Sequence, residues 1–302
     1  MILMSWNCQE LGNPEAIRAL RNMVKRKGPG VLFFMETNLD AGRVKVIRVK
    51  LGFDNAFAIP SLGRSGGLAL LWKEDTDVVI NNYSQHHIDA QMNSKQANMW
   101  HLTGFYGRPE QHRRKESWAF LKHLSGLDSL PWCCVSDFNE ILSANEKCAG
   151  RVRFVQQILE FQAAVNTCKL VDLGYQRASY TWNNNRNTFV NVQGRLDRAM
   201  VTTQWLDFFP RYSVAHCPRS ISDHLAVVVS THLGVGTHRR KKLVRRFEEQ
   251  WATNPACEKI IQESWQQEVS VGSPMFKLCQ KISRCRMALV DWSRVAFKFN
   301  SL

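Results

Sequence analysis

Short apolar runs recur along the first 235 residues, and polar residues separate them. Short runs rich in β-branched and aromatic residues are typical of strands, above all where both faces of a sheet are buried. The pattern predicts strands at residues 2–6, 31–35, 68–72, 78–80, 88–92, 99–106, 132–135, 179–182, 188–192, 196–201, 212–216 and 225–231. Strands therefore dominate this part of the chain.

Amphipathic stretches between these runs predict few helices, at about residues 14–27, 111–124 and 155–168. The first is the best marked. Asn13 is a suitable N-cap, Pro14 suits the first helical position, and Gly28 can end the helix in a left-handed conformation. Many strands with few helices between them favour an α/β fold built as a two-sheet sandwich flanked by helices, rather than a doubly wound parallel sheet.

The composition changes near residue 235, and the pattern beyond it is helical and basic. Residues 236–302 contain 13 Lys/Arg and 6 Asp/Glu, which is half of the net charge of +14. We therefore predict two parts, a domain at residues 1–235 and a helical extension at residues 236–302. Tryptophans 251, 265 and 292 of the extension are expected to pack rather than to stack on a ligand.

Charge and cysteine usage narrow the classes of function. The charge of +14 and the pI near 9.6 indicate a polyanionic partner, nucleic acid before membrane, although a basic surface can also serve solubility alone. Nine cysteines without C-x-x-C spacing argue against a zinc site and a disulfide framework. No apolar run reaches the length of a membrane span, and no signal peptide is evident. We expect a soluble intracellular protein.

Polar residues stand where several predicted strands end or begin. Asn7 and Glu36 each follow an apolar run, Asp137 and Asn139 follow another, and the pair 223–224 precedes the last run. Loops at the edge of a sheet are where chemistry is usually placed. One acid at such a place is common, whereas four matching places indicate a metal-dependent phosphodiesterase.

The residue types suit hydrolysis of a phosphodiester. Glu36 is the best candidate ligand for Mg²⁺, with Asn7 positioning it or a bound water. His224 can act as an acid or base near neutral pH if a carboxylate orients it, and Asp197 can supply that carboxylate. Asp137 can accept a proton from water. Whether Asp137 or His224 is the general base stays open, and an exposed acid or a surface ion pair is the alternative reading at each position.

The order of the motifs resembles the endonuclease/exonuclease/phosphatase superfamily, the fold of DNase I and the apurinic endonucleases. The motifs are Ser-Trp-Asn-Cys at 5–8, Glu-Thr at 36–37, Ser-Gly-Gly-Leu at 65–68, Phe-Tyr-Gly at 105–107, Asp-Phe-Asn-Glu at 137–140, Tyr-Thr-Trp at 180–182, Arg-Leu-Asp-Arg at 195–198 and Ser-Asp-His at 222–224. The Trp-Asn-Cys and Phe-Tyr-Gly-Arg-Pro runs look most like the endonuclease domain of plant LINE-type (non-LTR) retrotransposons. The resemblance covers about residues 1–232 and implies a four-layer α-β-β-α sandwich.

The resemblance also implies roles for single residues. Tyr106 and Asn139 would contact the scissile phosphate, Asp223 would act beside the metal, and Thr181 would touch the DNA backbone. Arg108 and the run Arg239, Arg240, Lys241 and Lys242 are the further DNA contacts that we expect. Mg²⁺ would be the cofactor, with Mn²⁺ as a substitute and no small-molecule cofactor.

The chain departs from the family pattern at three points. Ser136 replaces a usual glycine, Gln9-Glu10 stands where related plant sequences often have Arg-Gly, and no reverse transcriptase follows the segment that resembles a linker to one. The leading hypothesis is a monomeric nuclear endonuclease that nicks one DNA strand, with the cytoplasm as the alternative location. A catalytically silent nucleic-acid-binding remnant and a phosphatase of the same fold with a non-DNA substrate are the alternatives.

Overall fold

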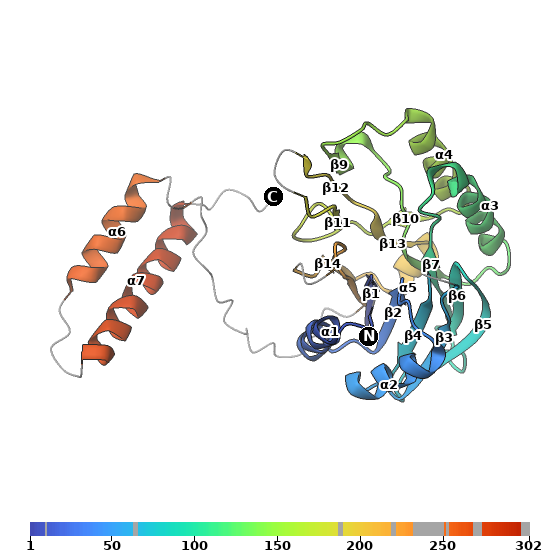
Figure 1. Cartoon of the computed structure of the whole chain (residues 1–302), viewed down its shortest axis with the longest axis horizontal. Helices are drawn as coiled ribbons and strands as arrows, with labels where there is room; N and C mark the ends of the chain where they lie inside the picture. The colour runs from blue at the N-terminus through green and yellow to red at the C-terminus, as the bar shows by residue number, and fades with distance from the viewer. Residues whose placement is uncertain are drawn as a thin grey trace. The chain divides into compact units, whose positions relative to one another are not determined.

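The computed structural model describes residues 1–9, 11–62, 66–186, 190–218, 222–231, 251, 254–267 and 274–296. The chain divides into two compact units, Met1–Leu233 and Gly234–Leu302 (Figure 1). The basic run predicted to contact DNA, at residues 239–242, lies outside the described residues, as do Glu10 and Ser65.

Two six-stranded sheets form the centre of the first unit. The first sheet contains, in spatial order, β14 (Ser213–His216), β15 (Val227–Ser230), β1 (Ile2–Asn7), β2 (Val31–Met35), β4 (Leu68–Trp72) and β3 (Asn55–Ile59). The second contains β10 (Val171–Asp172), β13 (Asp197–Val201), β8 (Trp132–Asp137), β7 (Trp100–Tyr106), β6 (His87–Met92) and β5 (Val78–Ser84). A small third sheet contains β11 (Trp182–Asn183), β12 (Gln193–Gly194) and β9 (Lys147–Cys148).

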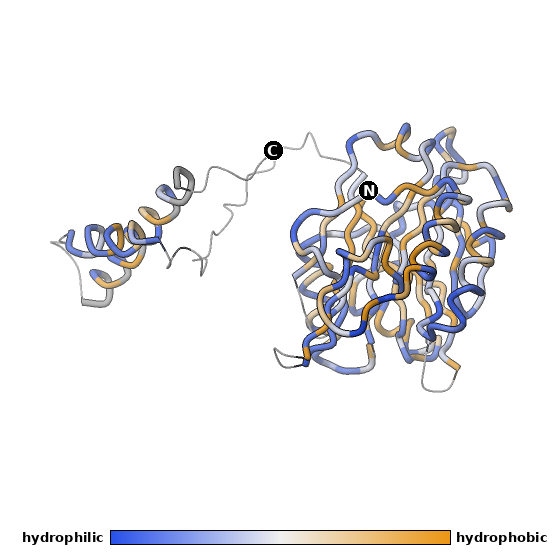
Figure 2. The backbone as a smooth tube through the Cα atoms, turned by 90° about the horizontal axis from the view of Figure 1, so that it is seen from above, coloured by the Kyte–Doolittle hydropathy of each residue, from blue (hydrophilic) through white to orange (hydrophobic). Residues whose placement is uncertain are grey.

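Helices cover the outer faces of the two large sheets. They are α1 (Pro14–Lys27), α2 (Ala41–Leu51), α3 (Arg114–Ser125) and α4 (Val155–Thr167). The short α5 (Thr203–Phe208) instead packs Trp205 into the core between the sheets, and η1 (Gln111–Arg113) and η2 (Ala144–Glu146) are 3₁₀ turns. One apolar core lies between the sheets, a second joins α1 and α2 to the first sheet, and a third joins α3 and α4 to the second sheet. The predicted four-layer sandwich is therefore confirmed, and Figure 2 shows its apolar interior.

Local signals explain why these elements form. All five residues of β2 are buried, as expected for a central strand covered on both faces. The Asn13 side chain accepts a hydrogen bond from the amide of Glu15, and Gly28 adopts a φ of 61°, so the predicted start and end of α1 are confirmed. Strand β1 lies between β2 and β15, which brings the beginning of the unit beside its end.

Two predictions of strands between residues 179 and 192 were wrong. Only Trp182–Asn183 and Gln193–Gly194 pair as strands there. Asn184 closes the intervening loop instead, because its side chain accepts from the amide of Val192 at 3.0 Å and donates to the carbonyl of Val190 at 2.9 Å. Asparagine side chains offer the backbone such local partners in place of a strand ladder. Residues 187–189 lie outside the described part.

The strand predicted at residues 132–135 extends to Asp137. This acid is the last residue of β8 and does not follow the strand. It pairs with Tyr106 on one side and with Asp197 on the other. The sequence pattern did not predict helix α2. Its N-cap is Asp40, whose side chain accepts a hydrogen bond from the amide of Arg43.

Two arginines of the Arg-Leu-Asp-Arg motif form a buried ion network. Arg195 bonds Glu146 at 3.0 Å and Asp172 at 2.6 Å, and Arg198 bonds the same two acids, with its Nη1 2.8 Å from each. The Arg198 side chain is fully buried. The alternative reading of this motif as a surface ion pair is therefore wrong. The network fixes both ends of the segment that carries Asp197.

In the second unit, α6 (Pro255–Gln266) and α7 (Pro274–Ala296) form a helical pair. Its core contains Trp251, Cys257 and Leu289, with Trp292 packed against it. Packing is thus confirmed for two of the three tryptophans. Trp265 is instead 41% exposed, with the Lys281 ammonium 5.6 Å from its ring centroid. Among the described helices, none has the length and apolarity required to span a bilayer.

We predict that Arg198→Met destabilises the first unit by about 3–5 kcal/mol, because removing one cation of a buried ion network leaves two carboxylates to share Arg195. Urea unfolding followed by tryptophan fluorescence measures this. Lys50→Met, at an exposed position, is the control and should change stability little. An equal effect of both substitutions would contradict the role of the network.

The same network predicts a loss of stability in acid. Burial alone would raise the pKa of Glu146 and Asp172, but the two arginines outweigh it and hold both pKa values below their ordinary range. Because the folded pKa values lie below the unfolded ones, near about 4, the stabilisation is complete above that range. It is lost as the pH falls through the lowered folded values. Unfolding measured between pH 7 and pH 3 should show a smaller pH dependence for Arg198→Met.

Candidate active site

Three polar residues align across neighbouring strands of the second sheet. Asp137 of β8 pairs in register with Tyr106 of the parallel β7 and with Asp197 of the antiparallel β13. Residues two positions away, Val135 and Ala199, belong to the core between the sheets. Because side chains alternate along a strand, all three polar residues face the first sheet. The pairing of these three strands therefore places a phenol and two carboxylates side by side.

The first sheet contributes Asn7 and Glu36. Asn7 ends β1, and Glu36 follows β2 with a left-handed φ of 53°. The Asn7 amide Nδ2 donates to Glu36 Oε1 at 3.1 Å and to Asp137 Oδ2 at 3.0 Å. The Tyr106 hydroxyl donates to the same Glu36 oxygen. One amide thus joins carboxylates from the two sheets.

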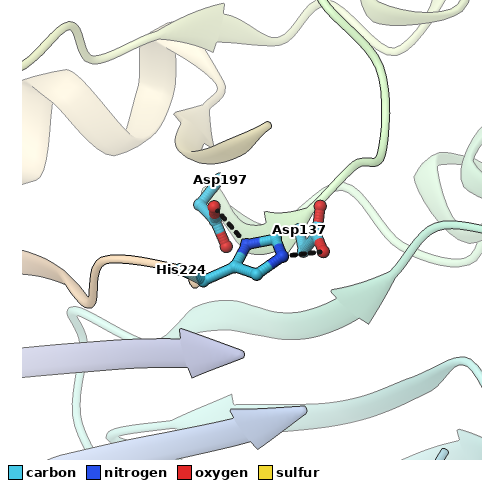
Figure 3. Close-up of side chains that lie close together, drawn as sticks. All are labelled: Asp137, Asp197 and His224. Atoms are coloured by element: carbon cyan, nitrogen blue, oxygen red, sulfur yellow. Dashed lines mark hydrogen bonds and ion pairs between the residues drawn. The ribbon is translucent and has the colours of Figure 1, made fainter. Parts of the chain in front are cut away.

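His224 completes the cluster from the loop that precedes β15. Its Nδ1 lies 2.8 Å from Asp197 Oδ2, and its Nε2 lies 3.7 Å from both Asp137 Oδ2 and Asp223 Oδ1. Figure 3 shows the imidazole between the carboxylates of Asp197 and Asp137. The ring is 4% exposed. The Trp6 indole holds the backbone by donating to the His224 carbonyl at 3.1 Å.

The surroundings shift the pKa of both central groups. Burial alone would lower the pKa of His224, but Asp197 and Asp137 outweigh it and raise the pKa to about 10. Burial, reinforced by Asp197, raises the pKa of Asp137 to about 6 even though His224 opposes the shift. Burial and Glu36 raise the pKa of the Tyr106 phenol, which keeps it a neutral donor. The imidazole is therefore a cation when only protein groups surround it.

Two side chains fix the Asp223–His224 loop. Trp182 Nε1 donates to Asp223 Oδ2 at 2.7 Å, and the Ser222 hydroxyl donates to the carbonyl of Asn7 at 2.8 Å. The Ser222 oxygen also accepts from the His224 amide at 3.0 Å. We expected a role for Thr181 in the Tyr-Thr-Trp motif and none for its neighbour. The contact of Trp182 with the Asp223–His224 loop cannot be predicted from the sequence, because it depends on which strands lie next to one another.

Thr181, for which we expect a contact with the DNA backbone, lies in the interior of the first unit. Thr181 is completely buried, and its hydroxyl oxygen accepts hydrogen bonds from the amides of Leu196 and Asp197, each at 2.9 Å. A hydroxyl with these partners has no access to a phosphate. Thr181 instead holds the start of β13, and with it the carboxylate that bonds His224.

Asn139 lies beside the cluster with its amide already engaged. Its Nδ2 donates to the Gly107 carbonyl at 2.9 Å, and its backbone amide donates to Asp137 Oδ1 at 2.9 Å. The strand ends at Asp137, and Asn139 has a φ of 56°. The alternation of side chains along a strand therefore does not extend from Asp137 to Asn139. Gly107 is required here, since a Cβ would lie 2.5 Å from the Phe138 carbonyl oxygen.

Arg108 and His86 lie at the margin of the cluster. The Arg108 guanidinium is partly buried and lies 3.4 Å from Glu116. His86, which the sequence did not single out, stacks on the Tyr106 ring at 6.3 Å between centroids. Its backbone carbonyl accepts from the Tyr106 amide at 2.7 Å. His86 thus supports the residue whose hydroxyl reaches Glu36.

The donor set suits a hard divalent cation. The carboxylates of Asp137, Asp197 and Asp223 lie beside His224, and the Asn7 amide links Glu36 to Asp137. One buried oxygen of Asp223 and one of Asp197 have no hydrogen-bond partner among the described residues. An excess of buried carboxylate oxygens is unfavourable without further positive charge, and oxygen ligands are those that Mg²⁺ prefers.

A second reading of the cluster makes the histidine a ligand. Among the described residues, Asp137, Asp197 and His224 offer ligand atoms within 4.8 Å of one another. Both imidazole nitrogens, however, face carboxylates of the protein. Glu36 instead accepts hydrogen bonds from the Asn7 amide and the Tyr106 hydroxyl.

Solved structures with this fold are numerous. An AP endonuclease from Archaeoglobus fulgidus is similar with a TM-score of 0.61 and 13% identity, covering 76% of this chain and 98% of that one. The endonuclease domain of TRAS1, a telomere-specific non-LTR retrotransposon, has a TM-score of 0.56 and 14% identity over 76% and 96% of the two chains. A 3′-5′ exonuclease from Neisseria meningitidis has a TM-score of 0.57 and 16% identity over 76% and 99%.

These identities are low, so the likeness shows the fold alone. No curated protein matches the sequence. The model of the endonuclease/exonuclease/phosphatase family matches residues 4–224, which spans every residue of the cluster from Asn7 to His224. Because that match covers well over half of its length, the chain belongs to the endonuclease/exonuclease/phosphatase family.

Proposed function

We propose that the chain is a divalent-metal-dependent phosphodiester hydrolase that nicks one strand of DNA. The observation that carries the proposal is the placement of His224 between Asp197 and Asp137. The net charge of +14 favours a polyanionic substrate over a small phosphate ester.

The protein groups have separable tasks in this proposal. Asp197 holds His224 through Nδ1, which leaves Nε2 to donate to an oxygen of the scissile phosphate. Asp137, whose pKa of about 6 lies near neutral pH, accepts the proton of the attacking water. The Tyr106 hydroxyl and the Asn139 segment bind the phosphate from the second-sheet side.

Glu36 and Asp223 would hold the cation, with Asn7 orienting Glu36. A bound Mg²⁺ or Mn²⁺ would supply positive charge to the phosphate oxygens and lower the cost of expelling an alkoxide. Arg108, which follows Tyr106 by two residues, would contact the DNA backbone.

We further propose that the chain derives from a plant LINE-type retrotransposon, with residues 236–302 corresponding to the linker that precedes a reverse transcriptase. The order of the eight motifs supports this origin. In this proposal the protein acts in the nucleus, and the basic run at residues 239–242 adds sequence-independent affinity for DNA.

Replacing the histidine tests the chemistry. His224→Ala should lower the kcat for nicking of supercoiled plasmid by about 10²–10⁴, the contribution of a positioned acid or base. Asp197→Asn should lower it similarly, since an amide no longer fixes the imidazole. Asp207→Asn makes the same chemical change at an exposed residue of α5 and should leave the rate unchanged. Circular dichroism establishes whether each variant is folded.

Two outcomes of this experiment reject the proposal. Folded His224→Ala that nicks like wild type would exclude the assigned mechanism. Wild-type protein that binds plasmid with Mg²⁺ present and never nicks it would favour the catalytically silent remnant.

Metal binding can be measured without activity. Mg²⁺ or Mn²⁺ should raise the Tm of the wild type with increasing concentration, because a ligand that binds only the folded state stabilises it. Glu36→Gln should abolish most of this shift, and Glu74→Gln, an exposed acid at the other end of the first sheet, should retain it. EDTA should stop nicking by the wild type. A shift that Glu36→Gln leaves intact would exclude Glu36 as the ligand.

A further inference from the structure

A cavity of about 500 Å³ lies between the first turns of α3 and α4, outside the cluster described above. Side chains from η1, α3, α4 and the loop after β8 line it. Trp118 and Phe154 provide aromatic surface, and Gln111, Gln156 and Gln157 provide amides. None of the tasks assigned to the candidate active site uses these residues.

Glu140 joins the lining of the cavity to the segment that contains Asp137 and Asn139. This acid lines the cavity, is completely buried, and bonds Arg114 at 2.8 Å and Arg153 at 3.3 Å. The Arg153 guanidinium also donates to the Asn139 carbonyl at 3.4 Å. Since Glu140 follows Asp137 by three residues, the chain between them spans at most about 10 Å. The cavity is therefore within reach of a nucleotide next to the scissile phosphate.

The residues that line the cavity include an exposed aromatic ring and unpaired polar groups, which are the kinds of group that bind a nucleobase. Phe154 is 54% exposed, and the Arg151 guanidinium lies 5.4 Å from its ring centroid. Aromatic faces bearing an arginine stack on bases of any sequence. The buried Oε1 of Gln157 and Nε of Arg114 have no hydrogen-bond partner among the described residues. An unpaired acceptor and donor suit the polar edge of a base.

Charge balance argues against an anion as the occupant. Two cationic side chains of the lining are paired with acids of the same lining, Arg114 with Glu140 at 2.8 Å and Lys115 with Glu160 at 3.1 Å. A free phosphate would have to compete with these carboxylates. A flat, neutral ring with polar edges meets no such competition.

We propose that this cavity binds an unstacked nucleobase of the DNA strand, adjacent to the scissile phosphate. The inference rests on the proposed function for its substrate class. The proposal predicts that the protein prefers DNA sites where a base is unpaired or easily extruded. A base that is already out of the stack enters the cavity without the free-energy cost of unpairing.

Binding in EDTA tests the cavity without cleavage. Fluorescence anisotropy of the full chain would compare two dye-labelled duplexes, identical except for one unpaired adenine. Wild type should bind the duplex with the unpaired base about tenfold tighter, the effect of one base–aromatic stack. Phe154→Ala should remove this preference and change the affinity for the paired duplex less than about twofold. Gln157→Ala should weaken the preference.

Leu159→Ala is the matched control, since it truncates another exposed apolar residue of α4 that does not line the cavity. It should keep the full preference. Equal affinity of wild type for both duplexes, or an equal loss for both in Phe154→Ala, would overturn the proposal. Displacement of the duplex by free deoxyadenosine would assign the cavity to a free nucleoside and overturn it too.

Failure of this inference can be separated from failure of the proposed function. A protein that nicks DNA but shows no preference for the unpaired base lacks the base site and keeps its function. A protein that prefers the unpaired base but never nicks keeps the base site and loses the proposed chemistry.

Discussion

The hydrogen bond between Asp197 and His224 connects the two halves of the sandwich, and the arrangement of the site depends on it. Asp197 begins β13 of the second sheet, whereas His224 precedes β15 of the first. Thr181 holds the amide of Asp197, and buried arginines on either side pin its strand. A carboxylate fixed in this way orients the buried imidazole and gives its other nitrogen one defined direction.

Much of this arrangement is accessible from local sequence rules. The Asn13 cap and Gly28 predict the limits of one helix because both act within a single turn. Polar residues that border buried runs predict a cluster at one sheet edge, and Asn7, Glu36 and Asp137 do meet there. These rules work because strand periodicity and edge position are set by neighbouring residues.

The remaining features depend on contacts between distant segments. Thr181 faces two backbone amides rather than solvent, and Trp182 reaches Asp223, because a short third sheet folds back beside the cluster. The predicted strand at residues 188–192 borders a loop in which the Asn184 side chain bonds the backbone of Val190 and Val192. His86 meets Tyr106 only through the pairing of β6 with β7. The pattern of hydrophobic and polar residues along the sequence does not show which distant residues become partners.

The pairing of β1 with β15 determines when the first sheet can be completed during synthesis. Ile2 is opposite Ser230, so a strand made at the start of the chain waits for the last strand of its sheet. At about 5–20 residues per second, that interval is roughly tens of seconds. Because His224 emerges just before β15, an unfinished chain has no complete cluster. A nascent polypeptide would thus lack the assembled cluster until the last strand of the first unit has been made.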